Sequence, residues 1–266
     1  MKAKEVAAAA AHKARFALGY GGYVATNLIF IPIALAVGAA TLPWPGLRRR
    51  ALSSLLRAVL RAFVFGYLDM LGICSVRVIG EAPKPGRPAV IISNHRSFLD
   101  PLILLATCPG AGILVKSRYS SWLAIWVLIR MFDFASIDRS SLASLAGAAE
   151  KCREIMAGGR SVIIFPEGTR SPSARMGEFK SLAFRLARET GAPVAPAAIC
   201  SDAPFMAKTP GSFAPRSKIG FTLEFLAPLY PEKFKDAGAL SNASYRTIAS
   251  ALSRAGRRSA GEASEK

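Results

Sequence analysis

The sequence predicts an α/β fold, in which a mixed, largely parallel sheet is flanked by helices and preceded by an apolar helical membrane anchor. Two observations predict it. After Gly80, short apolar runs alternate with helical stretches, and such alternation is typical of sheets with parallel pairs. Before that point, no charged residue occurs from Phe16 to Leu47. We therefore expect a membrane-associating helical segment at 1–76, the main domain at 77–258 and a frayed C-terminal tail at 259–266.

The uncharged N-terminal run is long enough to cross a bilayer at its centre, from Val24 to Leu42. Basic residues stand on both sides of it, so they give no asymmetry that would orient a single span. Pro32 interrupts the run, and the pattern fits a segment that returns at this proline or lies partly in the interface. A cleaved signal peptide is the alternative. The arginine triplet at 48–50 argues against cleavage, because such charge tends to stay cytoplasmic, where we expect the membrane-associated main domain to lie.

A second segment, from Ala51 to Val76, has apolar residues at near-helical spacing, with Arg57 and Arg61 on another face. This pattern is typical of a basic amphipathic helix on an anionic membrane surface. The alternative is a helix that packs on the protein's own core.

Composition indicates the kind of partner. Lys and Arg outnumber Asp and Glu by 35 to 17, which gives a formal charge of +18, and 52% of the residues are hydrophobic. Such a charge implies an anionic partner, and together with the apolar segments it favours an anionic membrane. We expect no nucleic-acid partner, because no zinc-finger spacing or RNA-binding aromatic motif occurs. The four scattered cysteines are expected to be small buried residues in a reducing compartment.

The main domain contains six short apolar runs that predict strands, at 89–93, 112–115, 134–137, 161–165, 193–199 and 217–226. Five further stretches predict helices, at 101–106, 121–131, 142–156, 179–190 and 240–258.

The first chemical cluster, at 94–101, directly follows a predicted strand, and active sites of α/β folds lie at the carboxyl ends of strands. Asp100 followed by Pro101 is a helix-start signal, which places His95 in the loop before that helix. On one continuous helix, side chains five positions apart would point roughly 140° apart, but across a turn they can meet. Asp100 would then fix the tautomer of His95 and leave its other nitrogen as a base. The alternative is that Asp100 only caps a helix and His95 is an ordinary loop residue.

The second cluster, at 165–171, also follows a predicted strand. It combines Glu167, backbone amides around Gly168, Thr169 and Arg170 in one tight turn, which would suit a phosphate with the arginine as its bidentate partner. The alternative is a solvated turn with a surface arginine.

Two further clusters carry less chemistry on their own. At 137–140, Asp138 and Arg139 follow a predicted strand and could form a plain surface pair. At 192–196 there is no reactive group, and two prolines stiffen the chain.

These four clusters, at spacings of about 40, 30 and 25 residues, resemble the motifs of the glycerolipid acyltransferase family and, within it, of the 1-acylglycerol-3-phosphate acyltransferases. His95 and Asp100 match the first motif, and Arg139 matches the end of the second. Residues 165–169 match the third in full. The strand that contains both prolines matches the fourth.

The resemblance covers about residues 75 to 225 and implies a glycerolipid acyltransferase-like fold. One departure concerns local packing, because Ser136 stands where the family often has an aromatic residue. Lys116, after the predicted strand at 112–115, resembles the family's lysine near the reacting carbonyl.

The resemblance also implies a reaction. The free sn-2 hydroxyl of lysophosphatidic acid gives its proton to His95, which Asp100 holds, and attacks the thioester of acyl-CoA or acyl carrier protein to give phosphatidic acid. Lys116 or nearby amides would stabilise the oxyanion. Arg139, the turn at 167–169 and Arg170 would bind the acceptor's phosphate. Apart from the acyl donor, which is a substrate, this reaction needs no cofactor, no metal and no protein nucleophile.

Rival readings change the acceptor or the class of protein. The acceptor could be another lysophospholipid, a lyso-ornithine lipid or glycerol-3-phosphate, the last of which fits least because those enzymes usually lack the proline and threonine of the third motif. A non-catalytic lipid carrier would have no need of the base at His95. A nucleic-acid binder would bind nucleic acid more strongly than anionic vesicles.

Overall fold

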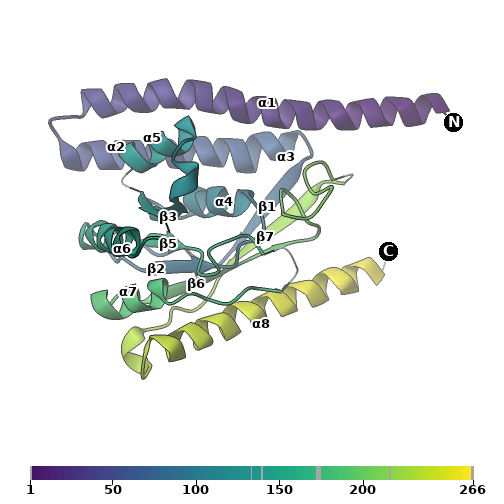
Figure 1. Ribbon diagram of the computed structural model, residues 1–266. Coiled ribbons are helices and arrows are strands. Elements are labelled where there is room, and N and C mark those ends of the chain that lie inside the picture. The colour runs from purple at the N-terminus through teal and green to yellow at the C-terminus, as the bar shows by residue number, and fades with distance from the viewer. Residues whose placement is uncertain (1, 133, 139, 172–174, 216, 265–266) are drawn as a thin grey trace.

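The computed structural model describes residues 2–132, 134–138, 140–171, 175–215 and 217–264. In this part of the chain, a seven-stranded sheet lies between two layers of helices (Figure 1). The strands are β1 (Cys74–Ile79), β2 (Val90–Ser93), β3 (Gly112–Lys116), β4 (Ala135–Ile137), β5 (Val162–Ile164), β6 (Val194–Ser201) and β7 (Ile219–Phe225). The α-helices are α1 (Lys2–Ala40), α2 (Pro45–Arg61), α3 (Leu68–Met70), α4 (Leu99–Thr107), α5 (Leu123–Met131), α6 (Leu142–Ala157), α7 (Leu182–Thr190) and α8 (Ala237–Ser264).

The sheet has the order β1-β7-β6-β2-β5-β3-β4. The β6–β7 pair is antiparallel and the other described pairs are parallel, which confirms the mixed, largely parallel sheet predicted from the sequence. Strand β2 is central, and Val90, Ile91 and Ile92 are all fully buried, as expected for a strand that is covered on both faces. All six predicted strands are present, and none of their ends shifts by more than two residues.

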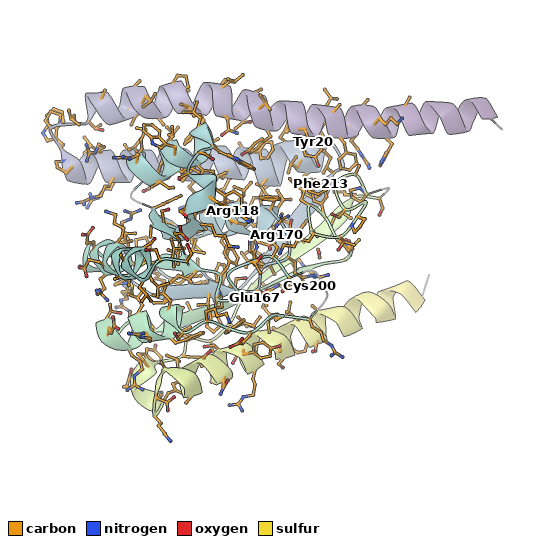
Figure 2. All side chains as sticks on the ribbon, in the orientation of Figure 1. Tyr20, Arg118, Glu167, Arg170, Cys200 and Phe213 are labelled. Carbon is orange, nitrogen blue, oxygen red and sulfur yellow. The ribbon has the colours of Figure 1, made fainter. Side chains whose placement is uncertain are left out.

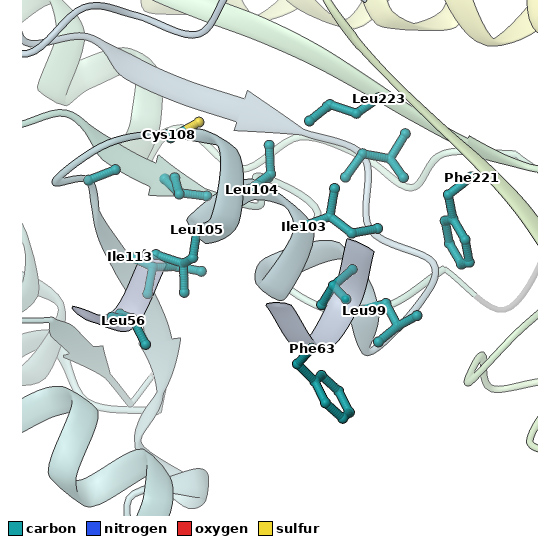
Figure 3. Close-up of a cluster of buried hydrophobic side chains, with 14 of the residues drawn as sticks. Leu56, Phe63, Leu99, Ile103, Leu104, Leu105, Cys108, Ile113, Phe221 and Leu223 are labelled. Carbon is teal, nitrogen blue, oxygen red and sulfur yellow. The ribbon is translucent and has the colours of Figure 1, made fainter. Parts of the chain in front are cut away.

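Each face of the sheet has its own apolar core. On one face, Ile91 belongs to a cluster with α1, α2 and α4, which Figure 3 shows around Ile103 and Leu104. On the other face, the neighbouring Val90 and Ile92 pack against α6, α7 and α8. This alternation follows from the two-residue period of a strand. Because β2 is packed on both faces, the start of the loop that follows it is held in place.

Helix α1 differs from its expected form. It runs for 39 residues, which corresponds to about 58 Å, and passes through Pro32 without ending. The chain reverses later, at 41–44, and α2 returns beneath α1 (Figure 1). The expected return at Pro32 is therefore wrong. A proline removes one hydrogen bond and costs about 3 kcal/mol within a helix, a local loss that does not by itself reverse the chain.

The helix expected to reach Val76 ends earlier. After Arg61 the chain continues as a π-helical turn, η1 (Ala62–Tyr67), and then α3, before β1 begins at Cys74. Strand β1 pairs in parallel with β7, whose residues lie far along the chain and leave no local signature of this pairing. Leu52 and Leu56 of α2 are buried in the core with α4, so part of its apolar face packs on the protein itself.

At the other end, α8 continues to Ser264, beyond residue 258, where we expected the domain to end. Residues 265–266 of the expected frayed tail lie outside the described residues. Three of the four cysteines, at 74, 108 and 152, are buried, and burial raises the pKa of each thiol to about 12. At neutral pH they are therefore uncharged.

Candidate active site

His95 and Asp100 meet across the turn between β2 and α4. Nδ1 of His95 lies 3.0 Å from Oδ2 of Asp100, whose side chain is almost completely buried. Asp100 is not the helix cap that we expected. Helix α4 begins at Leu99, and the Asp100 carboxylate points back along the chain, where Oδ2 accepts the N–H groups of Arg96 and Ser97 at 2.7 Å each.

One carboxylate oxygen therefore accepts three N–H groups. This arrangement keeps the proton of the His95 ring on Nδ1 and leaves Nε2 as the ring nitrogen that can accept a proton. The ring also stacks on Phe165 with the two centroids 4.2 Å apart. Its plane is thus held by a hydrogen bond at one edge and by an aromatic face.

Asn94 anchors the same loop from its other end. Its side-chain amide donates to the carbonyl of Ile199, and its side-chain oxygen accepts the N–H of Ile199, both at 2.8 Å. The side-chain amide thus makes the pair of hydrogen bonds to β6 that the backbone of one more β2 residue would make. Pro196 of the same strand pairs with Ile92, so the strand that contains the two prolines supports the His95 loop directly.

Glu167 turns toward the chain itself, and both of its oxygens are used. Oε1 accepts the N–H of His95 at 2.9 Å, and Oε2 accepts the N–H of Gly177 at 2.7 Å and the hydroxyl of Ser171. The residue is 6% exposed and does not line the cavity described below. These contacts favour a positioning role for Glu167 over the substrate contact expected from the sequence.

The three residues after Glu167 take a different direction and line a cavity. Gly168 has φ +67°, a left-handed conformation that glycine adopts at no steric cost, and it turns the chain so that Thr169 and Arg170 face the cavity. Arg170 donates to the carbonyl of Met206 at 2.8 Å, and its guanidinium lies 3.8 Å from the ring centroid of Phe98. Burial lowers the pKa of Arg170 from its ordinary value, and an arginine remains charged at neutral pH in spite of such a shift.

The cavity has a volume of about 390 Å³, within the range of roughly 300–1,000 Å³ that is usual for small-ligand sites. His95 and Phe165 line it together with apolar residues of α1, α4, β3 and α5. Among the described residues that line it, none is acidic and four besides His95 are basic. We call these four the cationic cluster: Lys116, Arg118, Arg170 and Lys208. A second cavity, of about 470 Å³, lies between the start of α8 and the loop before α7 and contains none of the candidate residues.

The cationic cluster includes two residues that the sequence analysis missed. Arg118 donates to the hydroxyl of Tyr119 at 2.8 Å, and its charge lowers the pKa of the nearby Arg170. Lys208 donates to the hydroxyl of Thr169 at 2.7 Å. Figure 2 labels Arg118 and Arg170, which lie in the same region of the molecule between α1 and the sheet. The position of Arg118, two residues beyond the end of β3, is the one signal that could have found it.

The remaining predicted residues lie at the edges of the site. Lys116 ends β3, pairs with Ile137 of β4 and lines the cavity. Arg139 lies outside the described residues. Its neighbour Asp138 is exposed, and hydrogen bonds from the hydroxyl and the N–H of Ser140 lower the pKa of its carboxyl.

Helix α1 contributes to the cavity in a way that the sequence did not indicate. Phe16, Tyr20 and Tyr23 line it, and the hydroxyl of Tyr20 donates to the carbonyl of Phe213 at 2.8 Å. Figure 2 labels Tyr20 and Phe213 where α1 meets the loop before β7. The apolar N-terminal helix therefore forms one wall of the space that contains His95.

Part of the chain is similar to known proteins. Residues 75–200 match the model of the family described as Acyltransferase. A chloroplastic 1-acyl-sn-glycerol-3-phosphate acyltransferase of Brassica napus is 34% identical over 46% of this chain and 35% of its own length. A probable 1-acyl-sn-glycerol-3-phosphate acyltransferase of Mycoplasma pneumoniae is 33% identical over 48% of this chain and 51% of its own length. The human 1-acyl-sn-glycerol-3-phosphate acyltransferase alpha is 32% identical over 47% of this chain and 44% of its own length.

The chain thus spans about half or less of the length of these relatives. Among solved structures, the 1-acyl-sn-glycerophosphate (LPA) acyltransferase PlsC of Thermotoga maritima has a similar fold, with a TM-score of 0.65 at 20% sequence identity. That likeness covers 86% of this chain and 95% of the other. The matched residues 75–200 contain β2 with its His95 loop, α4 with Asp100 and the turn at 165–171. The part of the chain that is similar to the Acyltransferase family therefore contains most of the residues of the candidate site.

Proposed function

We propose that the protein transfers a fatty acyl chain from acyl-CoA or acyl carrier protein to the sn-2 hydroxyl of lysophosphatidic acid, giving phosphatidic acid for phospholipid synthesis. The observation that carries this proposal is the hydrogen-bonded pair of His95 and Asp100 beside a largely apolar cavity that also holds the cationic cluster. The names of the relatives favour this acceptor over another lysophospholipid or a lyso-ornithine lipid.

His95 acts as the general base. Nε2 takes the proton of the acceptor hydroxyl while the hydroxyl oxygen forms a bond to the thioester carbon. The buried carboxylate of Asp100 stabilises the imidazolium that results, because a charge-assisted hydrogen bond is about twice as strong as a neutral one. When the tetrahedral intermediate collapses, the carbon–sulfur bond breaks and the proton passes from His95 to the leaving thiolate.

The two ends of the acceptor need different surroundings, which the cavity offers. Acyl chains fit beside its apolar walls, where Phe16, Leu68 and Ile73 meet. The phosphate fits the cationic cluster, in which Arg118 and Arg170 lie close enough for their charges to interact. Two like charges beside each other favour an anion between them. Lys116 stands near the reacting carbonyl and stabilises the oxyanion.

Membrane association supplies the substrate. Two helical stretches, Ala10–Ala40 and Pro45–Met70, are long and apolar enough to cross a membrane. Many side chains of α1 are exposed, among them Val24, Leu28 and Ile29. These features and the charge of +18 support the proposal that the protein acts at an anionic membrane surface, with its catalytic domain on the cytoplasmic side.

The test is acyl transfer in detergent micelles by the purified chain, with lysophosphatidic acid and labelled acyl-CoA. We expect labelled phosphatidic acid from the parent and a rate about 10²- to 10⁴-fold lower from His95→Ala. His12→Ala is the matched control, since the chain has two histidines, and it should keep the parent rate.

If the parent is inactive, acyl carrier protein replaces acyl-CoA as donor, and the alternative lysolipids then replace the acceptor. A His95→Ala variant that transfers acyl groups at the parent rate would overturn the catalytic assignment.

A further inference from the structure

Helix α5 exposes large apolar side chains, although it belongs to the α/β domain and not to the N-terminal helices. Trp122, Leu123 and Trp126 are 54%, 64% and 46% exposed. The inner side of the helix is well held, because Leu128 and Ile129 pack against the apolar core. Its C-terminal end packs on α1, where Phe132 stacks on Phe30 with centroids 5.9 Å apart. The exposed face is therefore a fixed surface of the folded domain.

Cations flank this face. The guanidinium of Arg130 lies 5.9 Å from the ring centroid of Trp126. At the other end, Arg118 lies 4.9 Å from the ring centroid of Tyr119, which in turn meets Trp122 edge to face at 5.5 Å. The sequence contains no Asp or Glu from residue 101 to residue 132. Tryptophan beside arginine, without acidic residues, is the composition that favours the interface of an anionic bilayer.

The face is also continuous with the apolar surface of α1. Figure 1 shows α5 beside α1, and the two helices contact each other directly. Tyr23 of α1 and Trp122 before α5 both line the cavity, and both are more than 40% exposed. A mouth of the cavity therefore opens between α1 and α5, with aromatic residues on both sides.

We propose that the exposed face of α5, formed by Trp122, Leu123 and Trp126, inserts into the headgroup region of an anionic bilayer beside α1. This inference rests on the membrane association proposed above and adds a second point of contact, made by the catalytic domain itself. With α1 and α5 both at the surface, the mouth between them faces the lipid. An acceptor then reaches His95 by moving sideways from the bilayer, without leaving it for water.

The tryptophans allow a direct test, because the chain has three and two of them belong to this face. In the full chain with Trp44→Phe, the tryptophan fluorescence reports on Trp122 and Trp126 alone. The chain is mixed with phosphatidylglycerol vesicles, with or without bromine on the acyl chains, and binding is followed by co-sedimentation. We expect the emission to move to shorter wavelength on binding and to lose most of its intensity with the brominated lipid.

Further variants test whether the exposed side chains of α5 themselves contribute to vesicle binding. Leu123→Ser combined with Trp126→Ser removes two exposed apolar residues that do not line the cavity, and should weaken vesicle binding by roughly tenfold or more. Leu142→Ser is the matched control, since Leu142 is 86% exposed on α6, and it should bind as the parent does.

The outcomes distinguish the two proposals. If the chain does not sediment with vesicles, the membrane association fails and this inference fails with it. If the chain sediments but the brominated lipid does not quench the emission, α5 stays in water and only this inference is wrong. A blue shift that depends on protein concentration without vesicles, with a doubled mass in sedimentation equilibrium, would assign the face to a second copy of the chain instead.

Discussion

The hydrogen-bonded Asp100 gives the sharpest test of the catalytic arrangement. Replacing Asp100 by Asn keeps the shape of the side chain and removes its charge. The amide can still place its oxygen where Oδ2 accepts the N–H groups of His95, Arg96 and Ser97. All three bonds then survive, but each becomes a bond to a neutral acceptor.

The size of the effect follows from these three bonds. A hydrogen bond to a charged group contributes about 1.5–3 kcal/mol and one to a neutral group about 0.5–1.5 kcal/mol, so each bond loses about 1 kcal/mol. The two backbone bonds hold the loop in the resting protein, and the free energy of unfolding should fall by about 2 kcal/mol. The bond to His95 matters most when the imidazolium forms. There we expect kcat to fall by about 10²- to 10⁴-fold, which corresponds to roughly 3–5 kcal/mol of barrier.

The assay measures kcat and KM for lysophosphatidic acid separately, and thermal unfolding of each variant in the same detergent. KM should change little, because Asp100 is buried behind His95 and does not line the cavity. The double variant with His95→Ala should be no slower than His95→Ala alone, since Asp100 acts through the imidazole. A folded Asp100→Asn protein with kcat within threefold of the parent would refute the reasoning about the imidazolium.

Three further predictions concern the loop, the phosphate and the N-terminal helix. Glu167→Gln should raise the activation free energy of transfer, and lower the free energy of unfolding, by about 1–3 kcal/mol each, because the oxygens of Glu167 hold the backbone of His95 and Gly177. The same assays should show no increase in KM; a raised KM with an unchanged Tm would restore the substrate-binding role. Arg118→Gln should raise KM for lysophosphatidic acid by about tenfold with little change in kcat, as expected for the loss of one charged phosphate contact, whereas Arg77→Gln on strand β1 should leave both unchanged. Gly22→Ala should destabilise the protein by about 1–3 kcal/mol in thermal unfolding, because the added methyl group would overlap the ring of Tyr67. Gly21→Ala is the control and should be neutral or stabilising, because a methyl group there would meet nothing within 4 Å. Equal Tm values for the two variants would mean that α1 is not packed on η1 as described.

Much of the fold could be predicted because the central strands carry their own signal. The residues around Ile91 and Ile163 are uniformly apolar, since helices cover both faces of the sheet, and Gly or polar residues mark their ends. Strand β1 was missed for the opposite reason. Its burial is partial, and its partner β7 lies on the far side of the sequence, so the helical pattern before it appeared to continue to Val76.

The site could be predicted in part for a similar reason. The pairing of His95 with Asp100 needs one local turn, which Pro101 announces. The inward direction of Glu167 depends on a backbone N–H 72 positions away, and the place of Arg118 depends on how η2 (Ser117–Tyr119) sits beside Arg170. Such relations come from tertiary packing, and no residue pattern along the chain records them.

The pairing of β1 with β7 also has a consequence for biosynthesis. Cys74 aligns with Ile219, 145 positions later. At the usual rate of translation, about 5–20 residues per second, β1 leaves the ribosome roughly 7–30 s before its partner. Through that interval the apolar surfaces of α1 and α2 are already made, while the sheet that will cover them is incomplete. The order of synthesis therefore gives the N-terminal helices time to meet a bilayer or a chaperone before the sheet that packs on them is complete.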